Sequence, residues 1–327
     1  MQRREFMALV GGATATWPLG ALAQKAPVRL GFLFAGTANS DYVRRLLAGL
    51  TQGLTENGMT EGRDYLLETR FADSYDHFPA LARELQQAKV RIIIPSTIAA
   101  VRAAQQLSPP IPVVMAAIND PVGTGLIASL AHPGGLTTGT ATLNQDVTPK
   151  LLEFLGAIVP RATTLAALYN PANPSSVSFL PSLRREADIR GVSLVELAFK
   201  SVADFASTLP TLVVTRRPDA LQLVADSFVL DQADRIAALA SAQRLPTLAS
   251  VAEVAYGGAL LAYGLSVTEV FHRSAYYVKR ILDGANPADL PVEQPTRIGL
   301  VINLKTAKAL GITILPTVLA RADEVIE

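Results

Sequence analysis

The sequence predicts an α/β protein with two similar lobes, each a parallel sheet with helices on both faces, joined by a hinge that the chain crosses several times. Two observations lead to this class. Short apolar runs rich in β-branched residues, typical of strands, alternate with amphipathic helical segments. A helix that connects two strands of one sheet in this way requires the strands to run parallel. The order strand–loop–helix–strand–helix–strand–helix–strand then occurs twice along the chain. With 327 residues, 50% hydrophobic and 17% charged, the chain can supply two sizeable cores.

The first 23 residues have the features of an export signal. Residues 3–6 read Arg-Arg-Glu-Phe, which fits the twin-arginine export pattern, and an apolar run follows. That run is too short and too interrupted by glycine and proline for a membrane-spanning helix. Because Ala-Leu-Ala at residues 21–23 resembles a signal cleavage site, we expect cleavage after Ala23 and a periplasmic location. The alternative is an uncleaved amphipathic terminus.

In the first half of the chain, strands and helices are expected in alternation. Strands are predicted by β-branched or alternating runs, and helices by apolar residues three and four positions apart. The expected strands are Val28–Phe34, Tyr65–Phe71, Val90–Ile94, Val113–Ala117 and the extended segment Thr137–Leu143. The expected helices are one capped by Ser40 or Asp41 and ended by Asn57-Gly58, then Asp76–Ala88, Ala99–Gln106 and Leu126–Ala131.

Two loops within residues 90–126 form the strongest candidate for a binding site. Ser96 and Thr97 follow the third strand, and Asn119 and Asp120 follow the fourth. Carboxyl ends of neighbouring parallel strands meet at one edge of a sheet, where ligands bind in open α/β folds. The two loops therefore offer hydroxyls, an amide and a carboxylate to one space. The alternative is structural, with the first loop capping its helix and the second forming only a turn.

The second half repeats this order. The expected strands are Thr163–Tyr169, Val192–Ala198, Ala220–Ala225, Pro246–Ala249, Ala259–Tyr263 and Ile298–Ile302. The expected helices are Phe179–Arg190, Asp204–Leu209, Asp231–Gln243 and Thr268–Leu282, with a proline-rich linker at Pro287–Pro295. Polar or aromatic residues again follow the strands, namely Tyr169, Asn170, Asp226, Ser227 and Tyr256. For Asp226 the alternative to ligand contact is a helix cap, and for the tyrosines it is packing.

These segments also suggest the lobe boundaries. We expect residues 26–143 and 264–296 to form lobe 1, and residues 144–263 and 297–327 to form lobe 2. Several crossings between two lobes would make a hinge.

Composition and motifs exclude several other classes. The formal net charge is +1 without a basic stripe, so no nucleic-acid partner is expected. The chain has no cysteine, and its three histidines, His77, His132 and His272, match no metal-ligand spacing. No phosphate loop, dinucleotide fingerprint or nucleophile elbow is present. We therefore expect no cofactor, no metal and no catalysis.

Several motifs resemble a known family. They are Gly49-Leu50-x-x-Gly53-Leu54-x-x-Asn57-Gly58, Asn119-Asp120-Pro121-Val122-Gly123-x-Gly125-Leu126, Tyr169-Asn170-Pro171-Ala172-Asn173-Pro174 and the tail LPVEQPTRIGLVINLKTAKALGITI from Leu290. The chain resembles the ABC-transport substrate-binding proteins of the tryptophan/tyrosine-transport-like group, which have the type I periplasmic-binding-protein fold. The resemblance runs nearly end to end, and the tail is its most specific part.

This resemblance implies two lobes, a hinge and a small ligand between them. It also implies delivery of the ligand to a membrane permease with a cytoplasmic ATPase. We therefore expect the protein to contact the membrane only through the permease, and we expect a monomer. Carried over by position, the ligand loops contain Ala35, Ser96, Thr97, Asn119, Asp120, Asn144, Tyr169, Asn170, Asp226, Ser227 and Tyr256. The first loop, Phe34-Ala35-Gly36-Thr37, departs from the family in its small side chains.

The expected mechanism is closure of the lobes on a ligand by hinge motion. Ser96 and Thr97, with the N-terminal amides of their helix, would hold a carboxylate, and Asp226 or Asp120 an ammonium. A tyrosine face would stack on a ring, which suits an amino acid or an aromatic acid. The alternatives are a sensor module that presents its ligand to a membrane receptor, and an unrecognised two-lobe enzyme. A ligand-controlled repressor would need an N-terminal helix-turn-helix, where this chain has the export pattern.

Overall fold

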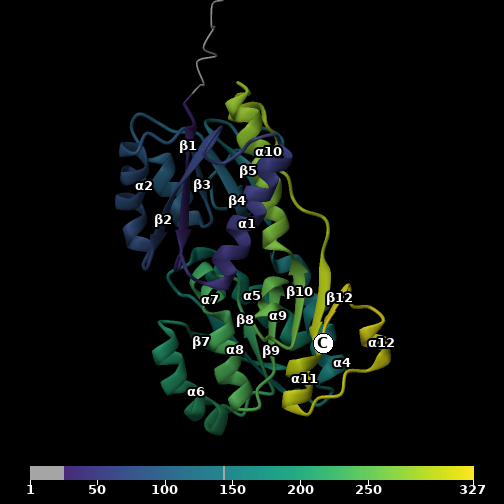
Figure 1. Cartoon of the computed structure of the whole chain (residues 1–327). Coiled ribbons are helices and arrows are strands. Elements are labelled where there is room, and N and C mark those ends of the chain that lie inside the picture. The colour runs from purple at the N-terminus through teal and green to yellow at the C-terminus, as the bar shows by residue number, and fades with distance from the viewer. Residues whose placement is uncertain (1–25, 143) are drawn as a thin grey trace, which may run out of the picture.

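The computed structural model describes residues 26–142 and 144–327, with the side chains of residues 144 and 145 left out. The predicted export signal, residues 1–23, lies outside the described residues. The described chain forms two α/β lobes, one above the other in Figure 1. Lobe 1 has a sheet with the order β2-β1-β3-β4-β5, and lobe 2 a sheet with the order β12-β11-β10-β9-β8-β6-β7. The predicted two-lobe α/β fold is confirmed.

All strand pairs of the lobe 1 sheet are parallel, as the alternation of strands and helices predicts. The strands are β1 (Val28–Ala35), β2 (Tyr65–Ala72), β3 (Ile92–Pro95), β4 (Val113–Asn119) and β5 (Thr137–Thr142). The helices are α1 (Asp41–Glu56), the short η1 (Tyr75–His77), α2 (Phe78–Gln87) and α3 (Ile98–Gln105). Ser40 caps α1, since its hydroxyl accepts the Val43 N–H at 3.1 Å.

The sheet of lobe 2 continues past the repeat. Its strands are β6 (Thr164–Tyr169), β7 (Ser193–Ala198), β8 (Ala220–Leu223), β9 (Thr247–Val251), β10 (Leu261–Leu265), β11 (Gly299–Asn303) and β12 (Glu324–Ile326). Its helices are η2 (Asn144–Val147), α4 (Thr148–Ile158), α5 (Pro174–Ile189), α6 (Val202–Arg216), α7 (Ser227–Asp231), α8 (Ala233–Ala242), α9 (Glu253–Tyr256), α11 (Leu304–Leu310) and α12 (Pro316–Leu319).

One strand pair departs from the expected parallel arrangement. β10 and β11 run antiparallel, with Leu261 opposite Ile302. Between these strands the chain leaves lobe 2, forms α10 (Val267–Leu282) and η3 (Pro287–Asp289) in lobe 1, and then returns. The chain therefore leaves lobe 2 at the end of β10 that faces lobe 1 and returns at the same end of the sheet, so β11 runs opposite to β10.

Helix α10 packs along α1 of lobe 1, although it follows a strand of lobe 2 (Figure 1). Two glycines of α1 allow the helices to approach closely. A Cβ atom on Gly49 would lie 2.6 Å from the carbonyl oxygen of Thr268, and one on Gly53 would lie 2.3 Å from that of His272. Both distances are too short for any side chain, so this contact requires glycine.

Some sequence-based expectations of local structure were wrong. The segment expected to be a helix at Leu126–Ala131 consists of bends instead, and it follows a turn at residues 121–125 in which Gly125 has a φ of 72°. A stretch of six residues is too short to offset the cost of helix nucleation. The Leu126 N–H also donates to the Pro121 carbonyl, which is a turn contact and not a helical one. Helix α4 was not predicted. The helix expected at Asp231–Gln243 is confirmed as α8, and the short α7 that precedes it was not predicted. The helix expected at Asp204–Leu209 begins at Val202 and continues to Arg216.

Candidate functional site

A cavity lies between the two lobes, at the carboxyl ends of their strands. We call it the binding cavity. Its polar lining is Ser96, Thr97, Asn119, Thr142, Asn173, Ser175, Asp226, Ser227 and Ser250. Its larger apolar lining is Phe34, Tyr42, Ile98, Ile118, Leu230, Val251, Leu265, Val267 and Phe271. The enclosed volume is about 70 Å³, which has room for a few water molecules.

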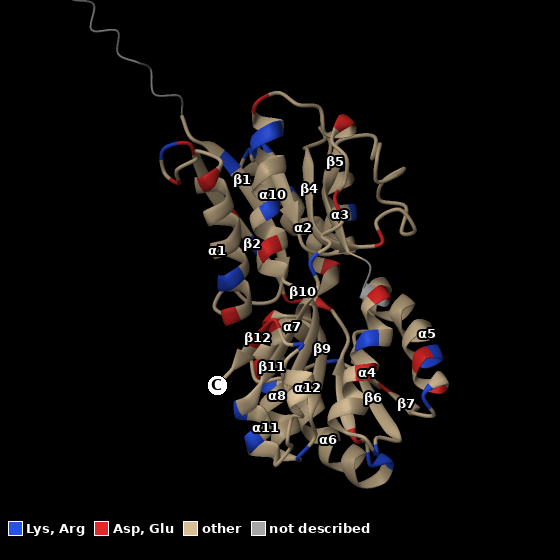
Figure 2. Ribbon diagram, turned by 90° about the vertical axis from the view of Figure 1, so that its right-hand side faces the viewer, with Lys and Arg blue, Asp and Glu red and all other residues tan. Residues whose placement is uncertain are grey.

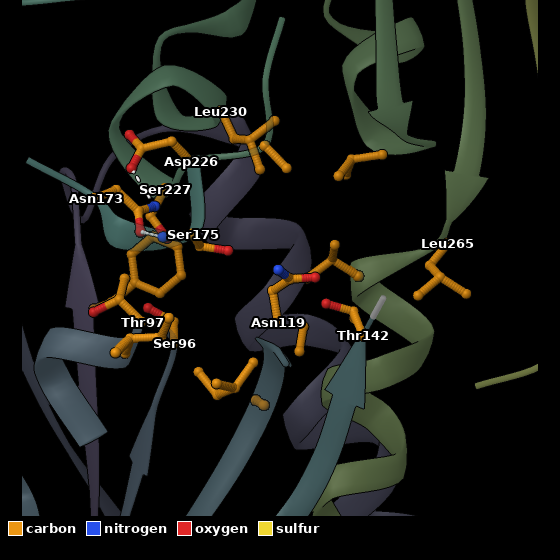
Figure 3. A pocket seen from close by; sticks show the side chains of 18 of the residues that line it. Ser96, Thr97, Asn119, Thr142, Asn173, Ser175, Asp226, Ser227, Leu230 and Leu265 are labelled. Carbon is orange, nitrogen blue, oxygen red and sulfur yellow. Dashed lines mark hydrogen bonds between the residues drawn. The ribbon is translucent and has the colours of Figure 1, made fainter. Parts of the chain in front are cut away.

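Three neighbouring strands bring the polar residues of lobe 1 together. Ser96 and Thr97 follow β3, Asn119 ends β4 and Thr142 ends β5. Figure 3 shows these side chains on one side of the cavity, with Asp226 and Ser227 on the other. A register shift in β4 precedes Asn119, and irregularities of this kind redirect the side chains at a strand end.

The two candidate hydroxyls after β3 have different roles. The Thr97 hydroxyl accepts the backbone N–H of Ala100 at 3.1 Å and so caps α3. The Oγ atom of Ser96 is buried and has no hydrogen-bond partner among the described residues. The structural alternative therefore accounts for Thr97, and the Ser96 hydroxyl is available to a ligand.

Two further hydroxyls of the binding cavity are also buried without a partner in the described part of the chain. They belong to Thr142 of lobe 1 and Ser250 of lobe 2. Leaving a buried polar group unpaired costs about 1–3 kcal/mol, and such groups are rare in folded proteins. Three of them face one cavity here, so a hydrogen-bonding ligand would satisfy groups that the protein leaves unpaired.

Asp226 is the most heavily hydrogen-bonded group in the cavity wall. Its carboxylate accepts the backbone N–H groups of Phe228 at 3.0 Å and Val229 at 3.1 Å, which makes it the N-cap of α7. The side-chain amides of Asn170 at 3.2 Å and Asn173 at 2.8 Å also donate to it. The hydroxyl of Tyr75, from lobe 1, is a further donor. Protein donors therefore occupy this carboxylate.

The structure brings five of the predicted site residues to the binding cavity. They are Ser96, Thr97, Asn119, Asp226 and Ser227. Asn170 donates a hydrogen bond to Asp226 and does not itself line the cavity. Ala35 is buried in the core of lobe 1. The side chain of Asn144 lies outside the described part of the structure. Contact of any of these residues with a ligand stays a prediction.

The remaining three predicted residues have other neighbours. The Asp120 carboxylate accepts the Gly123 N–H at 2.9 Å. Tyr169 packs against the core of lobe 2. The Tyr256 hydroxyl is hydrogen-bonded to Glu324 at 2.6 Å, and the guanidinium of Arg45 lies 4.9 Å from its ring centre.

Sequence reasoning missed several lining residues. The polar ones are Thr142, Asn173, Ser175 and Ser250, and the aromatic ones are Phe34, Tyr42 and Phe271. Thr142 and Ser250 stand at the ends of strands, so the rule that selected Asn119 applies to them as well. Phe271 lies on α10, and no local pattern in the sequence places that helix beside the cavity.

Acidic residues surround the part of the cavity near Tyr42. Burial, and next the negative charges of Glu253, Asp231 and Asp226, raise the pKa of the Tyr42 hydroxyl well above its ordinary value. Figure 2 shows acidic residues beside α7, where the lobes face each other. Among the described residues that line the cavity, none is Lys, Arg or His. The electrostatic potential there favours a positively charged group.

The described ranges, 26–142 and 144–327, contain no group of three His, Cys, Asp or Glu side chains arranged to hold a metal ion. They also contain no helix with the length and apolar character that crossing a membrane requires.

Comparison with known proteins gives a consistent result. The sequence model of the family described as ABC transporter substrate binding protein matches residues 38–326. A tyrosine-binding protein of Clostridioides difficile (strain R20291) is 25% identical over 266 residues, which cover 80% of this chain and 75% of that protein.

Two solved structures have the same fold. A conserved domain protein from Vibrio cholerae is 25% identical, with a TM-score of 0.82 over 91% of this chain and 99% of that one. An ABC domain from Streptococcus pneumonia in complex with L-Trp is 24% identical, with a TM-score of 0.80 over 92% of this chain and 100% of that one.

Proposed function

Because this chain belongs to the ABC transporter substrate-binding protein family, we propose that it is the extracytoplasmic component of an ABC importer and that it binds an aromatic amino acid in the cavity between its lobes. The match of the family model to residues 38–326 confirms the family resemblance seen in the motifs. The observation that carries the proposal is the set of three unpaired hydroxyls, from both lobes, that face one cavity.

The carboxylate of the ligand binds at the start of α3. The Ser96 hydroxyl donates to it, together with backbone N–H groups at the N-terminus of this helix. No lining side chain of the described cavity is cationic, so hydroxyls and amides must supply the hydrogen bonds.

The ammonium of the ligand is stabilised by the acidic surroundings of Tyr42. Asp226 is already occupied by donors, and Asp231 accepts the N–H of Thr37 at 3.1 Å. Their charges nevertheless act across the cavity, because a partly buried site screens them weakly. A zwitterion therefore suits the site better than a simple acid.

The apolar part of the ligand lies among aromatic and aliphatic side chains. The ring centres of Phe34 and Tyr42 are 6.2 Å apart, and Phe271 lines the same cavity. Rings bind well against such surfaces. The binding of tyrosine by the relative from Clostridioides difficile supports this choice of ligand.

Ligand exchange requires the lobes to open. The cavity volume of about 70 Å³ is smaller than an amino acid needs, so a ligand can enter only if the lobes move apart. The lobes open by rotation about the segments that connect them, the ligand binds, and closure buries it. The closed protein then delivers the ligand to a permease driven by a cytoplasmic ATPase.

A ligand screen followed by calorimetry tests the proposal. We expect a thermal shift with L-tyrosine or L-tryptophan, because a ligand at a hundred times its Kd stabilises a protein by about 2.7 kcal/mol. Ser96→Ala should weaken binding about ten- to a hundred-fold, as expected for a lost bond to a charged group.

The matched control is Ser207→Ala, on the exposed face of α6, which should bind with unchanged affinity. The absence of binding to every amino acid in the screen would contradict the proposal. Full affinity in Ser96→Ala would contradict the carboxylate position.

A further inference from the structure

A second space adjoins the binding cavity on the side of the hinge. We call it the hinge-side space. It is lined by Asp146 and Val147 after β5, by Gln294, Pro295 and Thr296 of the returning segment, and by Ile298. Thr142, Ser250 and Leu265 line both this space and the binding cavity. These three residues therefore mark the junction between the two.

Two hydroxyls at this junction are buried and unpaired. Thr142 is 5% exposed and Ser250 is 3% exposed. Their Oγ atoms have no hydrogen-bond partner among the described residues. Thr142 comes from lobe 1 and Ser250 from lobe 2, so the two lobes each contribute one hydroxyl to the same place.

The backbone fixes the position of Ser250. β10 has a register shift beside β9, and a Cβ atom on Gly264 would lie 1.8 Å from the carbonyl oxygen of Ser250. Only glycine permits this approach. A close contact between strands thus fixes the backbone from which the Ser250 side chain reaches the junction.

The junction lies at a suitable distance from the carboxylate position. Ser96 follows β3 and Thr142 ends β5, and β4 lies between these two strands. Neighbouring strands are about 4.8 Å apart, so the two positions are roughly 10 Å apart across the sheet. An aromatic amino acid bound by its carboxylate at Ser96 can reach Thr142 with the far end of its ring.

From this arrangement we infer that Thr142 and Ser250 form a subsite for a hydroxyl at the far end of the ligand's side chain, so that the protein prefers a phenolic amino acid to its deoxy analogue. This inference rests on the proposed function. A phenolic hydroxyl can donate to one of the two oxygens and accept from the other, because serine and threonine hydroxyls do both.

The preference follows from the cost of leaving both hydroxyls unpaired. Phenylalanine would fill the same space without pairing either oxygen, and sites built around hydrogen bonds discriminate strongly against such analogues. Since each lobe supplies one hydroxyl, both bonds form only when the lobes are closed. Recognition of the hydroxyl is thereby coupled to closure.

Calorimetry with L-tyrosine and L-phenylalanine tests the inference on the full-length mature protein. We expect the wild type to bind tyrosine at least about ten-fold more tightly than phenylalanine. Thr142→Val and Ser250→Ala should each weaken tyrosine binding about three- to ten-fold and leave phenylalanine binding within about two-fold. The double variant should bind the two ligands equally.

Two further variants control for packing. Thr148→Val removes another buried, unpaired hydroxyl that does not line either space, and it should leave the preference unchanged. Thr142→Ser keeps the hydroxyl and should keep the preference even if Thr142→Val folds poorly.

The outcomes separate this inference from the proposed function. Equal affinity of the wild type for tyrosine and phenylalanine would overturn the subsite and leave the proposed function standing. A preference that survives in the double variant would also overturn it. The absence of binding to any aromatic amino acid would overturn both.

Discussion

Asp226 connects three parts of the molecule through one carboxylate. It caps α7, fixes the amides of Asn170 and Asn173 in the loop after β6, and accepts the Tyr75 hydroxyl from lobe 1. The groups that it orders include Asn173 of the binding cavity. We therefore assign Asp226 a positioning role next to the ligand.

Replacement of this residue should mainly affect stability. Asp226→Ala leaves five donors without their acceptor and removes a helix cap, so the free energy of unfolding should fall by about 2–4 kcal/mol. Chemical denaturation measures this change. Asp188→Ala, on the exposed face of α5, should stay within about 0.5 kcal/mol of wild type. A similar small change in Asp226→Ala would show that the network contributes little.

Single site residues were predictable where topology alone determines their place. Ser96, Asn119 and Asp226 follow strands, and the ends of parallel strands must face the cleft. The same rule applies to Ser250, near the end of β9 (Thr247–Val251), although it was not selected from the sequence. The contact between Tyr75 and Asp226 joins residues 151 positions apart, and no local pattern specifies it.

The segment between η3 and β11 joins the lobes and also extends the sheet of lobe 1. Glu293 pairs with β5, since its N–H donates to Gly139 and its carbonyl accepts the N–H of Ala141. Its carboxylate accepts two hydrogen bonds from the Arg273 guanidinium of α10, at 2.7 and 2.8 Å. The hydrogen bond from Arg273 lowers the pKa of Glu293 below 4.5, against the opposing effect of burial.

This ion pair predicts a dependence of stability on pH. Because the folded-state pKa of Glu293 is lowered, the pair stabilises the fold above the ordinary pKa of 4.5, and this contribution is lost as the pH falls through the folded-state value. Glu293→Gln should lower Tm by about 1–3 °C at pH 7 and have no effect at a pH below both values.

Thermal melts of wild type and Glu293→Gln, from pH 7 down to a pH below the folded-state pKa of Glu293, check the prediction. Glu269→Gln, which breaks the more exposed pair with Arg297, is the control and should have no measurable effect at any pH. An effect of Glu293→Gln that is independent of pH would show that the charge of Glu293 is not responsible.

Among the elements, strands were predicted more closely than helices. Buried β-branched runs such as β3 have few alternatives in a parallel sheet. Helix α5 begins at Pro174, where Asn173 caps it, five residues before the expected start. Helix α6 continues past Pro210, because its packing against α8 outweighs the local preference of proline.

At the scale of the whole molecule, a few contacts hold the lobes together across the cleft. The Tyr75 hydroxyl donates to Asp226, the Thr37 N–H donates to Asp231, and Arg45 lies over the Tyr256 ring. Figure 1 shows α7 below β1 and β2 at this edge, whereas the segments that cross between lobes lie on the other side. Burial and the charge of Asp226 raise the pKa of Tyr75, so this hydroxyl stays a donor at any practical pH.

Loss of one such contact should weaken ligand binding without touching the ligand. Tyr75→Phe removes a hydrogen bond between the lobes, while Tyr75 itself does not line the binding cavity. We expect affinity to fall about three- to ten-fold, together with a larger radius of gyration of the ligand-free protein in X-ray scattering.

Tyr276→Phe is the matched control, because the hydroxyl of Tyr276 accepts a hydrogen bond from Arg280 of the same helix. It should change neither quantity. A ligand-free radius of gyration in Tyr75→Phe equal to that of wild type would show that this bond does not keep the lobes closed.

The overall architecture was the most predictable level. Alternation of strands and helices, repeated twice, leaves few possibilities other than two parallel-sheet lobes. The closing contacts were not predictable, because they depend on the relative orientation of lobes that the chain connects only through short segments.

The antiparallel strand β11 has a consequence for the order in which this protein can mature. Lobe 2 needs β11 and β12, which the chain supplies only after it has completed α10 of lobe 1. A nascent chain that ends before residue 299 therefore has an incomplete lobe 2 sheet with β10 at an unprotected edge. Lobe 2 can therefore complete its sheet only when synthesis is nearly finished, after every element of lobe 1 has been made.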